Sequence, residues 1–249
     1  MGIELAKQKP LGGKAYGSTP HLPNSRVGPG DWHIHEGQAR ILTEKARDRH
    51  DRIIVTEKLD GTCVTIAKVG GEIIPITRAG YHARTSPFAM HHMFADWVRE
   101  RECVFLGALS DGQRMAGEWL AQAHGTRYAI DDEDELFVAF AVIDGKQRLP
   151  HDEARAIMNR AGVRGAHVIR YGSPVSVDEV MEALGPSGFH RALDPVEGAV
   201  WVCERNGVFD FIAKFVKSDK ADGKFLPGCG GNPQDMPPVW NFSFKSAAA

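Results

Sequence analysis

The sequence lacks long hydrophobic runs, paired cysteines and a strong net charge. No apolar stretch among its 249 residues approaches the roughly 20 needed to span a bilayer, and the first residues lack the apolar core of a secretory signal. The four cysteines have no C-x-x-C spacing, which argues against a zinc site or a disulfide framework and favours reduced thiols in a cytoplasm. The net charge is −2, so nucleic acid would have to be bound through a local patch.

What is present is typical of a soluble globular protein, with 43% hydrophobic and 25% charged residues, in one large domain or two small ones. Periodicity and turn residues predict helices at 36–50, from Ser86-Pro87 to about residue 100, at 151–162 and at 176–185. They predict strands at 52–56, 62–68, 72–77, 114–122, 136–144, 197–205 and 208–217. Strands outnumber helices and mostly pair locally, so the predicted class is α+β with antiparallel sheets.

Several segments outside these elements carry polar or charged side chains but match no clear motif. Residues 1–35 are rich in Gly, Pro and His and read as an irregular arm. Its segment STPHLPNSR (18–26) could cover a nucleotide or a substrate strand, or simply pack on the core. The lysine-rich segment KSDKADGKF (217–225) could face a phosphate or merely be exposed to solvent. The histidine pairs at 33/35 and 91/92 have no partner at a standard zinc spacing.

The segment IIVTEKLDGTCVTIAKV (53–69) places Lys58 at the end of one β-branched run, just before another. We expect a hairpin whose Asp60-Gly61 turn is tight because glycine tolerates it. Alone, K-x-D-G is a common pattern, and a solvated lysine beside a plain turn would account for it. Further charges lie in or beside apolar, β-rich runs: Arg78, Glu118, Glu197, Lys214 and Lys217. Burying such charges is costly unless they pair or meet a ligand, so the set suits an anionic ligand with a divalent metal ion.

These segments, in this order, resemble the motifs of the covalent nucleotidyltransferases, the superfamily of RNA ligases, DNA ligases and mRNA capping enzymes. EKLDG (57–61) resembles motif I, and TRAGYHART (77–85) resembles the arginine segment that follows it. AGEWL (116–120), LFVAFAVID (136–144), EGAV (197–200) and FIAKFVK (211–217) resemble motifs III, IIIa, IV and V. The amino-acid sequences of these motifs are most similar to those of the RNA ligase 2-like branch of ATP-dependent RNA ligases.

The resemblance implies a nucleotidyltransferase (ATP-grasp-like) domain of antiparallel sheets flanked by helices. We place it at residues 36–230, between the arm at 1–35 and a C-terminal tail at 231–249. Only 32 residues follow Lys217, too few for a complete OB-fold. The DNA-ligase and capping-enzyme branches therefore fit less well.

The resemblance also implies a reaction in three steps, with ATP and Mg²⁺ or Mn²⁺ as cofactors. A lysine attacks the α-phosphate of ATP, the AMP moves to an RNA 5′-phosphate, and a 3′-OH then displaces AMP. The first step needs an unprotonated amine, whereas a free lysine has a pKa near 10.4. We expect burial and neighbouring cations to lower the pKa of Lys58.

By resemblance, the catalytic residues are Lys58, Asp60, Lys214 and Lys217. The nucleotide-binding residues are Glu57, Lys58, Arg78, Glu118, Phe140, Glu197, Lys214 and Lys217. The metal ion would be held through water by Asp60, Glu118 and Glu197. The partners implied are RNA ends or a nicked duplex, together with RNA repair proteins.

Some assignments have alternatives within the sequence. Arg84 competes with Arg78, and Phe137 with Phe140, because each pair shares one segment. Lys217 departs from the family pattern, since two residues rather than one separate it from Lys214. Other functions also stay open: a DNA ligase, a GTP-dependent guanylyltransferase, a protein that binds nucleic-acid ends without turnover, or an adenylylating domain that cannot seal alone.

Overall fold

The computed structural model describes residues 8–221, 223–229 and 232–242 and contains two β-sheets flanked by short helices. One sheet, sheet A, has the order β10-β9-β1-β8 and is fully antiparallel. Its strands are β1 (Asp51–Lys58), β8 (Val168–Gly172), β9 (Gly198–Arg205) and β10 (Val208–Val216). The second, sheet B, has the order β3-β2-β4-β5-β6. The predicted α+β class with antiparallel sheets is confirmed.

Sheet B carries one exception to the antiparallel rule. Its strands are β2 (Thr62–Val69), β3 (Glu72–Thr77), β4 (Gln113–Trp119), β5 (Phe137–Asp144) and β6 (Gln147–Arg148). The two-residue strand β7 (Arg164–Gly165) pairs with β5 in parallel. Neither β7 nor β6 was predicted, because strands of two residues leave no periodicity to read.

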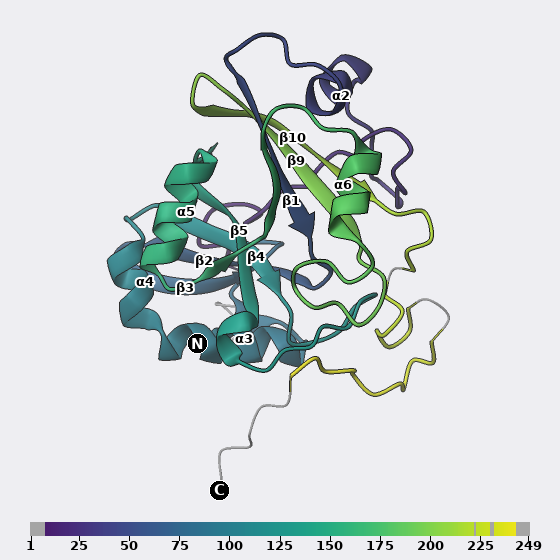
Figure 1. The fold of residues 1–249 in the computed structure, drawn as a ribbon. Coiled ribbons are helices and arrows are strands. Elements are labelled where there is room, and N and C mark those ends of the chain that lie inside the picture. The colour runs from purple at the N-terminus through teal and green to yellow at the C-terminus, as the bar shows by residue number, and fades with distance from the viewer. Residues whose placement is uncertain (1–7, 222, 230–231, 243–249) are drawn as a thin grey trace, which may run out of the picture.

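The helices divide between the two sheets (Figure 1). Helices α3 (Ala89–Glu100), α4 (Glu102–Ala108) and α5 (His151–Arg160) contact sheet B, and α2 (Glu36–Thr43) and α6 (Val177–Leu184) contact sheet A. Two 3₁₀ turns occupy Ala83–Thr85 and Glu133–Glu135. Among the described residues, no helix is long and apolar enough to cross a membrane.

Each sheet has its own hydrophobic core. In sheet B, Trp119 and Phe137 meet Phe94 and Trp97 of α3 in a cluster of aromatic rings. In sheet A, Trp201 lies at the centre of a second cluster, packed under α2 and α6. The space between the two sheets is therefore bordered by two separately packed layers.

The predicted hairpin at residues 53–69 is wrong. β1 pairs with β8 and β9, whereas β2 pairs with β3 and β4, so the two strands belong to different sheets. Residues 59–61 are thus a crossing between layers. Strand propensity identified both strands, but the partners of β1 lie more than 100 residues away, which local sequence does not reveal.

Other boundaries shifted for local reasons. The helix predicted at 36–50 ends at Thr43. The helix predicted from Ser86 begins at Ala89, because the Ser86 hydroxyl is bonded to the His91 side chain and accepts from the Phe88 backbone N–H. The capping box of α6 is confirmed. The turn at 206–207 is confirmed by positive φ at both residues, as a type I′ turn requires.

The described part of the arm runs beside β10 and reaches across to sheet B. The backbone N–H of Leu22 donates to the Lys214 carbonyl, and that of Lys214 donates to the Pro20 carbonyl. The backbone N–H of Ala15 donates to the Arg78 carbonyl at the end of β3. Leu22 is fully buried in the sheet A core. The arm therefore packs on the core and bridges the same gap that the chain crosses after β1.

Candidate active site

Lys58 is the last residue of β1 and lies where the two sheets meet. It pairs with Gly198 of β9, and its side chain is 18% exposed. The crossing that follows is tight because Gly61 packs directly on β4: a Cβ there would stand 2.7 Å from the Trp119 carbonyl oxygen. Gly61 is needed for this close approach and does not adopt positive φ. The amine is therefore enclosed between strand ends rather than displayed on a turn.

Carboxylates surround the amine. Lys58 Nζ donates to Glu197 Oε2 at 2.7 Å. Glu197 lies just before β9, next to Gly198, where a Cβ would stand 1.9 Å from the Phe215 carbonyl oxygen of β10. Glu118 comes from β4, and its Oε2 atom is buried with no hydrogen-bond partner among the described residues. Burying a carboxylate oxygen without a hydrogen-bond partner costs free energy and is unusual in folded proteins. Its presence here indicates a ligand-binding role for Glu118.

Burial and charge oppose each other at this cluster. Burial lowers the pKa of Lys58, but the surrounding carboxylates, Glu197 first, more than offset it, so the pKa is raised above its ordinary value. Burial raises the pKa of Glu118 to about 8, although the Lys58 charge acts in the opposite direction. Burial likewise raises the pKa of Glu197. The expectation that the site lowers the pKa of Lys58 is therefore wrong for the protein without ligands.

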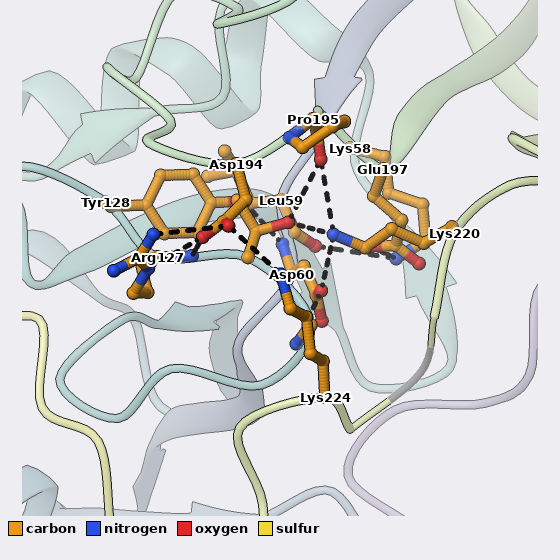
Figure 2. Close-up of polar contacts among 12 residues, drawn as sticks. Lys58, Leu59, Asp60, Arg127, Tyr128, Asp194, Pro195, Glu197, Lys220 and Lys224 are labelled. Carbon is orange, nitrogen blue, oxygen red and sulfur yellow. Dashed lines mark hydrogen bonds and ion pairs between the residues drawn. The ribbon is translucent and has the colours of Figure 1, made fainter. Parts of the chain in front are cut away.

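Asp60 is held by a lysine that the motif analysis did not single out (Figure 2). Lys220 Nζ lies 3.1 Å from Asp60 Oδ2 and also contacts the Thr126 hydroxyl. The same Asp60 oxygen accepts the backbone N–H of Gly125 at 2.9 Å. The Lys220 side chain is 4% exposed, so this is a buried ion pair. The only sequence signal for Lys220 was the lysine content of its loop, which fits a surface segment equally well.

The other two lysines predicted as catalytic are placed differently. Lys214, in β10, lies with its Nζ 3.8 Å from Asp31 Oδ2. Burial, followed by the charge of Lys58, lowers the pKa of Lys214, which indicates that the two amines are electrostatically coupled. Lys217 follows β10, and its Nζ lies 3.7 Å from Asp219 Oδ2. It lines neither of the two pockets described below.

The first pocket, here called the inner pocket, lies beside Lys58. Phe140 of β5 forms one wall, and its ring meets that of Tyr16 from the arm edge-on at 4.9 Å between centroids. Glu118 and Lys214 also line it. Phe137, by contrast, is fully buried in the sheet B core. Of the two phenylalanines, Phe140 is therefore the one that a ligand in this pocket can touch.

The structure separates the two candidate arginines in the same way. Arg78 lines the inner pocket, and its guanidinium donates to the Gly17 carbonyl at 3.3 Å and to the Ser18 hydroxyl at 3.2 Å. Arg84 forms an ion pair with Asp96 of α3 instead. The arm thus holds Arg78 toward the pocket, and α3 holds Arg84 away from it.

Glu57 borders the inner pocket, but its carboxylate is already engaged. Oε2 accepts a hydrogen bond from His190 Nδ1 at 2.7 Å and one from the backbone N–H of Phe189 at 3.0 Å. Gly188 packs against the same carboxylate, because a Cβ there would stand 2.0 Å from Glu57 Oε1. The geometry gives Glu57 a part in fixing the loop at 188–190 against the end of β1.

A second pocket, here called the outer pocket, is also lined by Lys58. Four residues line both cavities: Lys58, Cys63, Arg78 and Glu118. The inner pocket encloses about 120 Å³, and the outer pocket about 670 Å³. The lysine therefore lines both a narrow pocket and a much wider one.

The carboxylates do not form a direct chelating site. Among the described residues, no three His, Cys, Asp or Glu side chains converge closely enough to hold a metal ion. Asp60, Glu118 and Glu197 are nevertheless hard oxygen donors near one amine, and one of their oxygens is buried without a partner. This donor set fits Mg²⁺ or Mn²⁺ with its water shell better than a directly ligated ion.

Comparison with known proteins identifies one matching family and several similar folds. A family model described as RNA ligase matches residues 51–216. Among solved structures, the chain is similar to an apo mutant of the Naegleria gruberi RNA ligase, at 15% identity and TM-score 0.51, covering 82% of this chain and 57% of that one. A mutant of the same ligase with ATP and Mn matches at 14% identity and TM-score 0.51, covering 80% and 60%. The comparison with curated proteins found no match.

These likenesses have a defined extent. The chain spans about three fifths of the length of the Naegleria chains it matches. At such low identity, the solved structures establish the shared fold. The family match covers both ends of the constellation described above, from β1, which carries Lys58, to β10, which carries Lys214.

Proposed function

The chain belongs to the RNA ligase family, enzymes of the nucleotidyltransferase type, and from this we propose that it is an ATP-dependent RNA ligase. It joins 3′-OH and 5′-phosphate ends through a covalent lysyl-AMP and an adenylylated RNA 5′ end. One observation carries the proposal: Lys58 stands between two pockets, with Glu197 Oε2 at 2.7 Å from its amine. The chemical requirement it meets is an amine that can reach two substrates in turn.

In the inner pocket we assign the nucleotide. Adenine stacks on Phe140, with Tyr16 bracing the ring, because these are the aromatic rings that border this cavity. Arg78 and Glu118 contact the ribose, and Lys214 contacts the phosphates, where its charge neutralises the triphosphate. Glu57 acts by positioning, since its carboxylate holds the loop at 188–190 rather than pointing at the ligand.

Lys58 must lose a proton before it attacks. The nearby carboxylates raise the pKa of Lys58, so its side chain is protonated in the protein without ligands. Glu197 is within hydrogen-bond distance and is the group that can take the proton. Mg²⁺ or Mn²⁺, held through water by Asp60, Glu118 and Glu197, would supply the positive charge that cancels these carboxylates and favours the free amine. Lys220 fixes Asp60 in the orientation that this requires.

The amine then attacks the α-phosphorus, pyrophosphate leaves, and AMP is bound to Nζ. In the second step an RNA 5′-phosphate oxygen displaces the amine, and in the third a 3′-OH displaces AMP. Lys217 has no assigned contact in this scheme, because its amine lies beside Asp219 and outside both pockets. Its predicted catalytic role is kept only as a hypothesis for the ligand-bound protein.

The proposal is tested by incubating the protein with α-labelled ATP and Mg²⁺ or Mn²⁺, after pyrophosphate has stripped any bound nucleotide. We expect one AMP on the denatured wild type and none on Lys58→Ala. The exposed Lys45→Ala is a matched control and should label normally. GTP and NAD are offered in parallel, and nicked RNA and nicked DNA follow as sealing substrates. If no nucleotide labels the protein, the ligase proposal is wrong and a protein that binds nucleic-acid ends without turnover is favoured. Preference for GTP would indicate a guanylyltransferase, and preference for nicked DNA would indicate a DNA ligase.

A further inference from the structure

The outer pocket has walls that the nucleotide does not need. Its far side is the loop 78–88, which connects β3 to α3 and presents two aromatic rings, Tyr81 and Phe88. Phe88 is 56% exposed, more than any other aromatic side chain among the described residues. A single exposed aromatic ring is ordinary, but two on one wall of a cavity that reaches a reactive lysine are a stacking surface.

Arg78 is the cation that this cavity keeps once Lys58 carries AMP, because the amine then loses its charge to the P–N bond. Lys58 and Arg78 line it, and Glu118 is the single carboxylate among its lining residues. Lys9 lies against one of these rings, with its amine 4.6 Å from the centroid of the Tyr81 ring. α3 begins at this edge, since Phe88 and His91 line the cavity, and its first turn has no acidic residue.

The arm fixes the shape of this wall before any ligand arrives. Gly80 has φ +97, and a Cβ there would stand 1.9 Å from the Gly13 carbonyl oxygen, so arm and loop are in direct backbone contact. The backbone N–H of Ala15 donates to the Arg78 carbonyl at 3.1 Å. The aromatic loop is therefore held as part of the folded protein, which lowers the cost of ordering it on binding.

We propose that the outer pocket binds the 5′-phosphorylated end of an RNA strand, with its terminal base stacked on Phe88 and Tyr81 and its phosphate beside Arg78. This deepens the proposed function and rests on it. The narrow inner pocket holds the AMP on one side of Lys58, and the acceptor must approach from the other. A terminal phosphate needs a cation, which Arg78 supplies on this side, whereas a 3′-OH end brings no extra charge to the reacting atom.

The transfer balances with the residues present. An oxygen of the RNA 5′-phosphate attacks the phosphorus of the lysyl-AMP, and a P–O–P bond forms as the P–N bond to Lys58 breaks. The leaving amine takes back the proton that Glu197 accepted in the first step and returns to the ammonium form paired with the Glu197 carboxylate, the form found in the protein without ligands. Arg78 lines both pockets and can contact the phosphates on each side of this step.

The test separates the acceptor site from the first step. Phe88→Ala, Tyr81→Ala and wild type are each loaded with labelled AMP, isolated, and mixed with a 12-nucleotide RNA carrying a 5′-phosphate. We expect lysyl-AMP formation within about twofold of wild type, which also reports correct folding. Single-turnover transfer to RNA should fall about tenfold or more, within the roughly 5- to 150-fold range for a lost stacking contact. Phe88→Trp should transfer like the wild type. Tyr171→Ala, which removes an exposed aromatic ring that lines neither pocket, should also transfer normally.

A second measurement needs no ATP, so it can detect RNA binding in the outer pocket even if the ligase proposal is wrong. The same RNA, with 2-aminopurine as its 5′-terminal base, is titrated with unlabelled protein. We expect quenching that requires the 5′-phosphate and weakens in Phe88→Ala. The proposal would be overturned if Phe88→Ala and Tyr81→Ala both transferred AMP to RNA and quenched the fluorescence as strongly as the wild type does. So would normal transfer with loss only of sealing of a pre-adenylylated RNA, because the pocket would then hold the 3′-OH strand.

Discussion

Replacing Glu118 by glutamine should make the protein more stable at alkaline pH while impairing its reaction with ATP. Glu118 Oε2 is buried without a hydrogen-bond partner among the described residues, and burial raises the pKa of the carboxyl from 4.5 to about 8. The unfolded chain ionises this group at its ordinary pKa. The folded state therefore binds the proton more tightly, and its stability falls as pH rises from about 4.5 through 8. Glutamine keeps the shape and removes the titration.

The size of the effect follows from the shift. For a carboxyl wholly removed from water, a displacement from 4.5 to about 8 corresponds to about 3 kcal/mol of lost stability at pH 7. Glu118 lines two solvent-connected pockets, so roughly half of this, about 1.5 kcal/mol, should be observed. Near pH 4 the wild type is protonated in both states, and the two proteins should be equally stable.

The assay is urea unfolding of wild type and Glu118→Gln without nucleotide or metal, from pH 4 to 9. The difference in the free energy of unfolding should grow with pH in favour of the variant and level off above about pH 8.5. Lysyl-AMP formation should be slower in the variant, since the ribose and metal contacts are assigned to the ionised group. Parallel pH profiles for the two proteins would refute the argument that this carboxyl is held uncharged by burial.

Three further predictions test how the site is built. Lys220→Met should cost about 3 kcal/mol in urea unfolding because it leaves the buried Asp60 charge unpaired, whereas Lys217→Met should cost less than about 1 kcal/mol; equal losses would contradict the assignment of the buried partner. Gly61→Ala should lower the free energy of unfolding by about 1–3 kcal/mol, since its Cβ would meet a backbone carbonyl; an unchanged thermal midpoint would show that the crossing can relax. Phe137→Ala should destabilise the fold by about 3–5 kcal/mol, while Phe140→Ala should mainly weaken ATP binding in calorimetry; the reverse pattern would exchange their roles.

Much of the fold could be predicted from local sequence. The longer strands and most helices were found at nearly the right positions, because β-branched runs, turn residues and a capping box act over a few residues. The short elements β6, β7, β8 and α4 were missed, since two to seven residues leave little periodicity. The pairing of β1 with β8 and β9 was missed because it depends on tertiary contacts.

The candidate site shows the same division between residue type and surroundings. The motif order pointed to Lys58, Glu118, Glu197 and Lys214, and the structure brings these four to one region. Sequence could not give the sign of the pKa change at Lys58, because that depends on how many carboxylates surround the amine in space. The same limit hid Lys220, since a lysine in a polar loop carries no sign of burial.

The crossing at residues 59–61 links the fold to the proposed chemistry. A lysine at the tip of a hairpin would be solvated on most sides, with a pKa near that of a free amine and no fixed neighbours. As the last residue of β1, Lys58 instead has sheet A behind it, Glu118 of sheet B facing it, and a pocket on each side. Gly61 makes this arrangement possible because no side chain fits between the crossing and β4. The motif's glycine is thus required by the contact between layers, and that contact places the amine beside both pockets, as the proposed reaction needs.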